Sequence, residues 1–340
     1  MSIIETDKLT KVFKGDVRAV DGIDFEVKQG EIFGFLGPNG AGKTTTIKML
    51  NTLIAPTSGT ANVAGYDIVK QASDVRTSIG YVAQDVGVDE HSTGKENLTL
   101  YGHFYRLDKA TIKQRIAEIF ELVDLVGYEN KMVKTYSGGM RKRLDLAMGL
   151  IHNPKLVFMD EPTTGLDPQT RSKIWEYIRK ITKELGITIF LTTHYLEEAD
   201  QLCNRVAIID LGKIIAKGTP SELKSSIGGD VINLSPCKGD EAACSQFMTN
   251  AQKALESESF VQRIQPAEEE LAVYVDNAKT AAPAIMRILA EKGIEVETLS
   301  ISHPSLDDVF LKYTGKTIRH QEGQASSFSD IARRSERRKS

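Results

Sequence analysis

The chain has 340 residues, enough for about two domains. Lys and Arg number 43 against 46 Asp and Glu, so the formal net charge is −3, and 41% of the residues are hydrophobic. This composition excludes a wholly disordered chain and argues against a nucleic-acid-binding protein, which would carry a strongly basic domain.

No apolar stretch reaches the ~20 residues that a membrane-spanning helix needs, so we expect the chain to act at a membrane only through a partner. Charged residues within Met1–Lys11 argue against a signal peptide. The cysteines Cys203, Cys237 and Cys244 lie at no metal-ligand spacing, which favours free thiols in a reducing cytosolic compartment.

Residues 1–220 alternate short apolar runs with helical patterns, which predicts an α/β domain. Near its start, Ala19–Val27 and Gly59–Ile68 are typical of antiparallel strands with glycine turns. Fully buried parallel strands are predicted for three further runs: Ile32–Leu36, Leu156–Met159 and Ile187–Thr192.

A glycine-rich loop that matches the pattern GxxxxGK[ST] follows the first of these parallel strands. Its glycines let backbone N–H groups turn towards a phosphate, and the following helix adds positive potential. We expect Lys43 to reach the β- and γ-phosphates and Thr44 to offer its hydroxyl to Mg²⁺. The predicted nucleotide contacts in this loop are Gly37, Pro38, Asn39, Gly40, Ala41, Gly42, Lys43, Thr44 and Thr45.

A second helix begins after Ser137, Gly138 and Gly139. Its exposed N–H groups predict a second anion site, since a serine N-cap alone would not explain two glycines. One chain therefore has two phosphate-binding edges but one nucleotide loop. We infer that two chains pair head to tail, with the serine edge of one against the γ-phosphate held by the other.

Two acids, Asp160 and Glu161, end an apolar strand. We expect Asp160 to hold the Mg²⁺ shell and Glu161 to polarise the attacking water. His194 follows another buried strand, at the sheet edge where ligands bind, and an imidazole there can donate to a γ-phosphate oxygen.

The pattern changes after a linker at Ser225–Asp230. Residues 230–302 follow the order βαββαβ, which is typical of a small ferredoxin-like α+β sandwich, and Leu306–Tyr313 suggests one more short helix. We therefore expect an accessory domain over 230–315. Residues 316–340 form a polar, basic tail that we expect to be disordered.

Over residues 1–220 the chain resembles the ATP-binding subunits of ABC transporters, because the motifs of that family occur in its order. They are Gly37–Thr44 (Walker A), Gln84 (Q-loop), Tyr136–Met140 (signature), Leu156–Asp160 with Glu161 (Walker B and base), Gly165–Asp167 (D-loop) and His194 (switch).

The resemblance implies a P-loop ABC ATPase domain with a RecA-like parallel core, an antiparallel β subdomain and a helical subdomain at about 87–150. It also implies that Phe13 stacks on adenine and that Gln84 touches Mg²⁺ and senses the membrane subunit. Tyr136 and Met140 replace the commoner Leu and Gln of the signature. That form is similar to drug-resistance or sodium-efflux exporters.

Such a subunit binds ATP and Mg²⁺ at the cytoplasmic side of the membrane and powers a separate ABC-2 type permease, as a pair of identical chains or with a paralogue. The cargo remains open among drugs, lipids, sodium and polysaccharides. Two alternatives are a soluble ABC ATPase of translation or DNA repair and a P-loop kinase or GTPase. The single cassette and the lack of a long coiled coil argue against the first, and the lack of an NKxD-like motif against a GTPase.

Overall fold

The computed structural model describes residues 1–226, 229–236, 241–266, 270–302 and 304–314. These residues divide into two compact units, one covering Met1–Pro220 and one beginning at Ser221. The second unit therefore begins earlier than the predicted residue 230, because it includes nearly all of helix α8 (Pro220–Ser225). The predicted tail at 316–340 lies outside the described residues.

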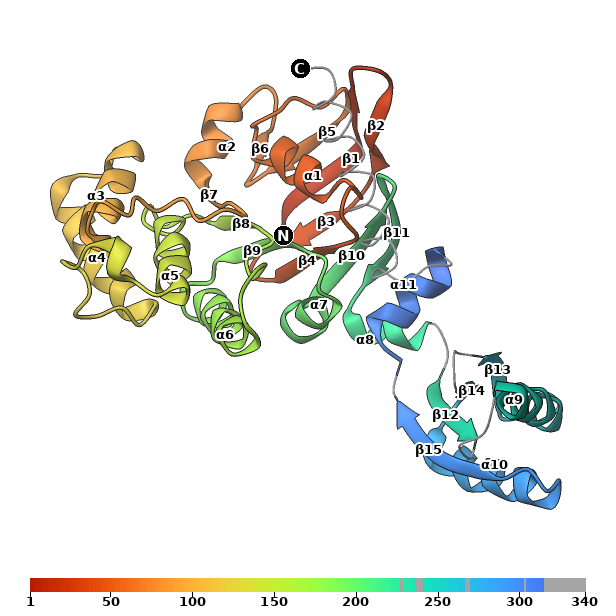
Figure 1. The fold of residues 1–340 in the computed structure, drawn as a ribbon. Coiled ribbons are helices and arrows are strands. Elements are labelled where there is room, and N and C mark those ends of the chain that lie inside the picture. Colours follow the sequence, from red (N-terminus) through yellow and green to blue (C-terminus); the bar gives the residue numbers. More distant parts are fainter. Residues whose placement is uncertain (227–228, 237–240, 267–269, 303, 315–340) are drawn as a thin grey trace, which may run out of the picture. The chain divides into compact units, whose positions relative to one another are not determined.

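The first unit is built around a six-stranded sheet in the order β11-β10-β4-β9-β8-β7 (Figure 1). Strands β10, β4, β9, β8 and β7 are parallel, and only β11 runs antiparallel to its neighbour. Every residue of β4, β8 and β9 is buried, as predicted. The strands are β4 (Ile32–Leu36), β7 (Ile79–Val82), β8 (Leu156–Asp160), β9 (Thr188–Thr193), β10 (Arg205–Asp210) and β11 (Lys213–Gly218).

The parallel strands end at one edge of this sheet, where helices α1 (Lys43–Leu50), α6 (Pro168–Leu185) and α7 (Leu196–Leu202) follow β4, β8 and β9. The sequence defines both ends of α6. The side chain of Asp167 caps its first turn by accepting from the N–H of Thr170, and Gly186 ends it at a φ of +65°.

A second, antiparallel sheet has the order β2-β1-β5-β6, with β3 also paired to β1. The two runs predicted as single strands are each divided. Ala19–Val27 is interrupted at Asp24 and Phe25, and Gly59–Ile68 turns at Ala64 and Gly65, both at positive φ as a two-residue hairpin requires. The strands are β1 (Ser2–Phe13), β2 (Val17–Ile23), β3 (Glu26–Lys28), β5 (Ser58–Val63) and β6 (Tyr66–Asp67).

Helices α3 (Gly94–Phe104), α4 (Lys109–Leu122) and α5 (Gly138–Met148) form a helical part of the first unit, within the predicted range 87–150. They lie beyond β7 and β8, on the side away from the antiparallel sheet, while α2 (Ala72–Ser78) precedes β7 (Figure 1). Thr93 and Glu96 form a capping box that starts α3.

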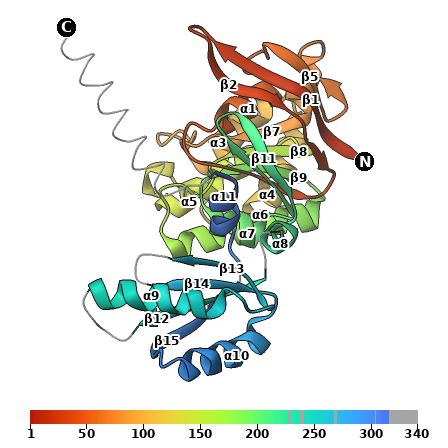
Figure 2. The same ribbon diagram turned by 90° about the vertical axis from the view of Figure 1, so that its right-hand side faces the viewer.

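The second unit follows the predicted βαββαβ order, and its four strands form one antiparallel sheet in the order β13-β14-β12-β15. Helix α9 packs against β13 and β14, and α10 against β12 and β15 (Figure 2). Its elements are β12 (Asp230–Pro236), α9 (Glu241–Leu255), β13 (Val261–Pro266), β14 (Leu271–Val275), α10 (Ala278–Glu291), β15 (Val296–Ser302) and α11 (Leu306–Thr314).

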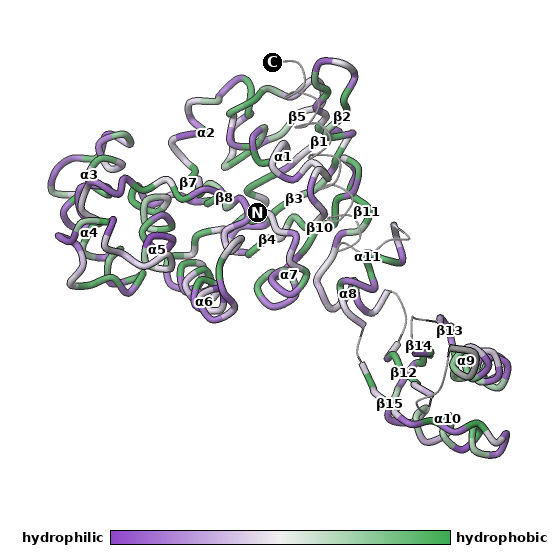
Figure 3. Tube along the Cα trace, in the orientation of Figure 1, coloured by the Kyte–Doolittle hydropathy of each residue, from purple (hydrophilic) through white to green (hydrophobic). Residues whose placement is uncertain are grey.

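Hydrophobic and hydrophilic residues alternate along the helices of both units (Figure 3). This pattern is typical of helices that pack with one face against a core. Within the described ranges, no helix is long and apolar enough to span a bilayer. Cys203 and Cys244 are free thiols, and Cys237 lies outside the described residues.

Candidate functional site

The loop between β4 and α1 requires glycine at two positions. A Cβ atom at Gly37 would collide with the carbonyl oxygen of Ile209, and one at Gly42 with the carbonyl oxygen of Ala19. Gly42 also has a φ of +109°. The loop backbone is thus packed closely against neighbouring strands, and the N-terminus of α1 opens at its end as a phosphate cradle requires.

The ammonium group of Lys43 lies inside this loop and is only 4% exposed. Its Nζ donates to the carbonyl oxygens of Gly37 at 2.8 Å and Pro38 at 3.1 Å, and it lies 3.1 Å from Oε1 of Glu161. The loop therefore holds one buried positive charge next to a carboxylate from β8.

Asp160 at the end of β8 lies close to Thr44 from α1, as the sequence predicts. Thr44 Oγ1 is 3.3 Å from Asp160 Oδ1, and the same oxygen accepts a 2.5 Å hydrogen bond from the hydroxyl of Thr192 on β9. A hydroxyl and a carboxylate are the oxygen donors that Mg²⁺ prefers, so these residues fit the predicted ion. Among the described residues no cluster of three or more His, Cys, Asp or Glu could hold a metal ion.

Glu161 is held in an uncommon backbone conformation with a φ of +48°. Its N–H donates to both the hydroxyl and the carbonyl oxygen of Thr192. One carboxylate oxygen faces Lys43, and the other lies 3.1 Å from Nδ1 of His194 and accepts from Thr164 Oγ1 at 3.2 Å. Backbone and side chain are therefore fixed by β9, the phosphate loop and the following turn.

Burial alone would raise the pKa of Glu161, but the hydrogen bond with His194 and the charge of Lys43 outweigh it and lower the pKa to about 2. The group is therefore a carboxylate at neutral pH. Its position between a cation and an imidazole suits a base that must stay ionised next to phosphate.

Glu161 is expected to contribute to acid unfolding. Its pKa in the folded chain is below the ordinary value of 4.5, so its stabilising effect is full above about pH 5 and is lost as pH falls towards 2. Urea unfolding at about pH 7 and pH 3 should show a smaller acid-induced loss in Glu161→Gln than in the wild type. Each unit of lowered pKa is worth about 1.4 kcal/mol. Equal losses in both proteins would contradict the low pKa.

The serine edge predicted at Ser137 opens a separate cleft. Ser137 caps α5 by accepting from the N–H of Met140 at 3.2 Å, and a side chain at Gly138 would meet nothing within 4 Å. The cleft has a volume of about 370 Å³, and the described residues of the loop 37–45 are not part of its lining. Its walls come from α5, the D-loop and α6: Ser137, Gly138, Gly139, Arg143, Gly165, Leu166, Asp167, Thr170, Lys173 and Ile174.

Two predicted residues lie at the margins of this arrangement. Phe13 at the end of β1 is 44% exposed, with Nζ of Lys11 at 5.3 Å from its ring centroid. Gln84 is exposed and follows β7, at the same sheet edge as Asp160. Adenine stacking by Phe13 and Mg²⁺ contact by Gln84 remain predictions.

Sequence reasoning missed Thr192, whose hydroxyl joins the two acids by donating to Asp160 and accepting from the N–H of Glu161. A threonine in a strand is common because its branched side chain suits the pleat, so the sequence carries no sign of this role. Only the pairing of β8 with β9, which sets Asp160 opposite Thr192, reveals it.

A buried ion pair within α5 forms hydrogen bonds to the backbone of the segment around Gln84. Lys142 Nζ lies 3.3 Å from Asp145 Oδ2 and donates to the carbonyl oxygen of Ala83, while Asp145 Oδ1 accepts from the N–H of Gly87. Burial raises the pKa of Asp145, opposed by Lys142. The helix that begins at the serine edge is thereby attached to both sides of Gln84.

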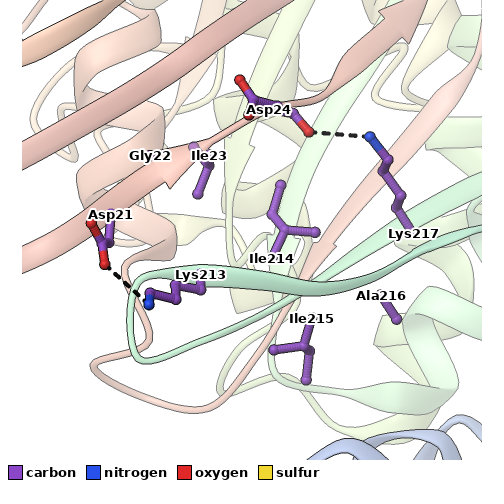
Figure 4. A pocket seen from close by; sticks show the side chains of 9 residues that line it. All are labelled: Asp21, Gly22, Ile23, Asp24, Lys213, Ile214, Ile215, Ala216 and Lys217. Atoms are coloured by element: carbon purple, nitrogen blue, oxygen red, sulfur yellow. Dashed lines mark hydrogen bonds and ion pairs between the residues drawn. The ribbon is translucent and has the colours of Figure 1, made fainter.

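Another pocket lies between β2 and β11, where Ile23 and Ile214 line it between two pairs of charged residues (Figure 4). Lys213 Nζ is 3.4 Å from Asp21, and Lys217 Nζ donates to the carbonyl oxygen of Asp24 at 3.3 Å. Because the lysines are engaged with these partners, the pocket offers no concentrated charge, and we assign no ligand to it.

Two family models match the chain. The model described as ABC transporter matches residues 20–164, and the model described as ATP-binding protein DrrA1-3-like, C-terminal domain, matches residues 218–314. The first covers the phosphate loop, the serine edge and the two acids. The second covers the second unit, including α8.

Curated relatives are similar over almost the whole chain. The daunorubicin/doxorubicin resistance ATP-binding protein DrrA of Streptomyces peucetius is 43% identical over 92% of each chain. The linearmycin resistance ATP-binding protein LnrL of Bacillus subtilis is 37% identical over 93% of this chain and 100% of its own. The Nod factor export ATP-binding protein I of Cupriavidus metallidurans is 39% identical over 94% of this chain and 99% of its own.

Solved structures of ABC transporter subunits are similar to a large part of the chain. CbiO1 from Clostridium perfringens, part of the ABC transporter complex cbiONQ, has a TM-score of 0.62 at 26% identity, over 75% of this chain and 96% of that chain. A dimeric ATP-binding cassette in a post-hydrolysis state bound to ADP and Pi has a TM-score of 0.57 at 25% identity. The match covers 64% of this chain and 98% of that chain.

Proposed function

This chain belongs to the ATP-binding subunits of ABC transporters, and we propose that it powers export through a separate ABC-2 type permease at the cytoplasmic face of the membrane. As a member of this family it binds and hydrolyses ATP. The observation that carries the proposal is the meeting of Lys43, Asp160, Glu161 and His194 at one sheet edge, with a second anion-binding edge at Ser137.

Each residue at the sheet edge has a distinct role in the proposed mechanism. The loop N–H groups and Lys43 bind the phosphates. Thr44, Asp160 and Gln84 would hold Mg²⁺, which would neutralise phosphate charge. Glu161 accepts a proton from the attacking water, and His194 holds the Glu161 carboxylate and orients it. The lowered pKa of Glu161 keeps it able to accept that proton at neutral pH.

The active form is proposed to be a head-to-tail pair, of two copies or of this chain with a paralogue. The Ser137 cleft is lined by the signature and the D-loop and offers free N–H groups at the start of α5. One of the similar solved structures is a dimeric cassette bound to ADP and Pi, which supports this arrangement. Each γ-phosphate would then bridge two chains, so that hydrolysis opens the pair.

The permease is proposed to dock on an apolar patch of α3. Leu100 and Phe104 lie one helical turn apart and are 50% and 68% exposed, and Val86, two residues after Gln84, is 42% exposed. Tyr101 joins the two segments, because its ring contacts Phe104 and its hydroxyl lies near Gly87. A patch beside Gln84 suits a partner that must respond to nucleotide.

Phe104→Asp is expected to abolish co-purification of the chain with its permease from detergent-solubilised membranes, because the new carboxylate would be buried at the interface without a partner. ATP binding by the isolated chain should stay unchanged. Val126→Asp is the matched control, since Val126 is 65% exposed in the turn after α4. Equal loss in both variants would contradict docking at this patch.

The class of partner is tested by tagging the full chain and identifying what it retains. Recovery with a polytopic membrane protein supports the proposal, whereas recovery only with ribosomes or DNA favours the soluble ABC ATPase. Faster turnover of GTP than of ATP would favour the GTPase alternative. Two of the relatives above are named for resistance to antibiotics, so antibiotics are the first cargo to test.

A further inference from the structure

Glu198 on α7 is a buried carboxyl group that joins three elements near the site. It is fully buried, and its Oε1 accepts two hydrogen bonds of 2.8 Å, one from the hydroxyl of Thr163 and one from the indole N–H of Trp175. Oε2 is also buried, and Thr193, the residue before His194, is a further hydrogen-bonding partner of the carboxyl group. A carboxyl group in such a place needs a reason beyond packing.

Thr163, Trp175 and Glu198 lie on segments that follow the predicted catalytic residues in the chain. Thr163 lies two residues after Glu161, on the turn that leads to the D-loop, and Trp175 lies on α6, which that loop starts. Glu198 lies one helical turn after His194. A single oxygen therefore ties the segment after the base to the helix after the switch histidine.

A second contact joins the same two helices. The guanidinium of Arg171 on α6 lies 4.2 Å from the ring centroid of Tyr195, and that ring lies 4.1 Å from the ring of His194. Movement of the first turn of α6 would therefore act on His194 through Tyr195 as well as through Glu198.

The same turn of α6 borders the Ser137 cleft. Asp167 and Thr170 line the cleft with Gly165 of the D-loop, and Gly139 approaches the methyl group of Thr170. A nucleotide held by a second chain would, on entering the cleft, contact the start of α6 and the D-loop, which follows Thr163. The hydrogen bond from Thr163 to Glu198 thus connects the border of the cleft to α7, which follows His194.

We propose that Glu198 is a positioning residue that couples occupancy of the Ser137 cleft by a second chain to the alignment of His194 and Glu161 in the first. It does not touch nucleotide. It fixes the Thr163 turn and α7 to one another, so that the D-loop and the histidine move together. The inference rests on the head-to-tail pair of the proposed function and adds a residue outside its motifs.

Burial raises the pKa of Glu198 above its ordinary value, more than the hydrogen bonds with Thr193, Thr163 and Trp175 and the charge of Arg171 lower it. Glutamine offers the same acceptor at the same reach, so Glu198→Gln is the conservative variant.

Steady-state kinetics of the full chain test the coupling. Glu198→Ala and Thr163→Val are expected to lower kcat for ATP by about tenfold or more, since small misplacements of reacting groups are costly in rate. KM for ATP should change by less than about twofold, because the phosphate loop is untouched. Glu198→Gln should keep at least about half of the wild-type kcat.

Two controls separate coupling from simple loss of stability. Thr188→Val removes an equally buried hydroxyl that accepts from the N–H of Gly30 at the opposite end of β9. Trp175→Phe removes the hydrogen bond of the indole N–H to Glu198 and keeps that of Thr163. If these variants lower kcat as much as Thr163→Val at equal melting temperature, the inference is wrong.

Trp175 is the only tryptophan of the chain, so its fluorescence reports on this junction alone. In a Glu161→Gln background, addition of Mg²⁺ and ATP is expected to shift its emission, since closure on the cleft moves α6. The added change Glu198→Ala should leave ATP retention intact and abolish the shift.

The outcomes distinguish the inference from the proposed function. If Glu161→Gln retains no ATP and forms no pair, the proposed function fails. If it retains ATP and pairs but Trp175 emission stays constant, the coupling through Glu198 is refuted while the proposed function stands. Wild-type kcat in a folded Glu198→Ala protein would refute it as well.

Discussion

Glu161→Gln is expected to bind ATP and to hydrolyse it at least about 100-fold more slowly than the wild type, because a neutral amide cannot take the proton of the attacking water. Lys43 would still face an amide oxygen, so the phosphate loop should keep its shape. The chain should then accumulate as an ATP-bound pair. Phosphate release and gel filtration with ATP measure the two effects.

Glu184→Gln is the matched control for this prediction. It makes the same chemical change on the last turn of α6, at an exposed position. Its hydrolysis rate should equal that of the wild type. A Glu161→Gln protein with wild-type turnover would mean that another group accepts the proton, and a protein that stays monomeric with ATP would contradict the paired arrangement.

Asp145→Leu is expected to lower the free energy of unfolding by about 3–5 kcal/mol, because it leaves the buried ammonium of Lys142 without its counter-charge. The N–H of Gly87 would also lose its acceptor. Replacing both partners, as Lys142→Met with Asp145→Leu, should recover most of this loss, since an apolar pair of similar size carries no buried charge. Urea unfolding of the three variants measures it.

The control here is Glu118→Leu, which breaks the surface pair with Arg115 on α4. Glu118 is 45% exposed in that pair, and exposed pairs contribute about 0–1 kcal/mol. If the double variant is as unstable as Asp145→Leu, the attachment of α5 to Ala83 and Gly87, rather than the buried charge, accounts for the loss. The ATP hydrolysis rate of the double variant then shows whether the hydrogen bonds of α5 to Ala83 and Gly87 also affect catalysis.

The sequence allowed the site to be predicted where chemistry follows directly from chain order. The loop with Lys43 and the acids Asp160 and Glu161 follow apolar runs, and parallel strands must end at the same edge, so their proximity could be expected. Thr192 could not be found in this way, because its role depends on which residue of β8 lies opposite it.

Glu198 shows a second limit of the sequence. Glu197 and Glu198 are adjacent and chemically identical, yet Glu197 is exposed and Glu198 is fully buried. The short α7 offers too few turns for its periodicity to decide which one faces α6.

The left-handed backbone at Glu161 limits which residues could replace the glutamate in a paralogue of this chain whose nucleotide site is inactive. Asparagine and aspartate tolerate a φ of +48° and glycine adopts it freely, whereas valine or isoleucine would strain the junction between β8 and the following turn. In a heterodimeric exporter, the inactive nucleotide site should therefore carry Asn, Asp or Gly at this position more readily than a β-branched residue.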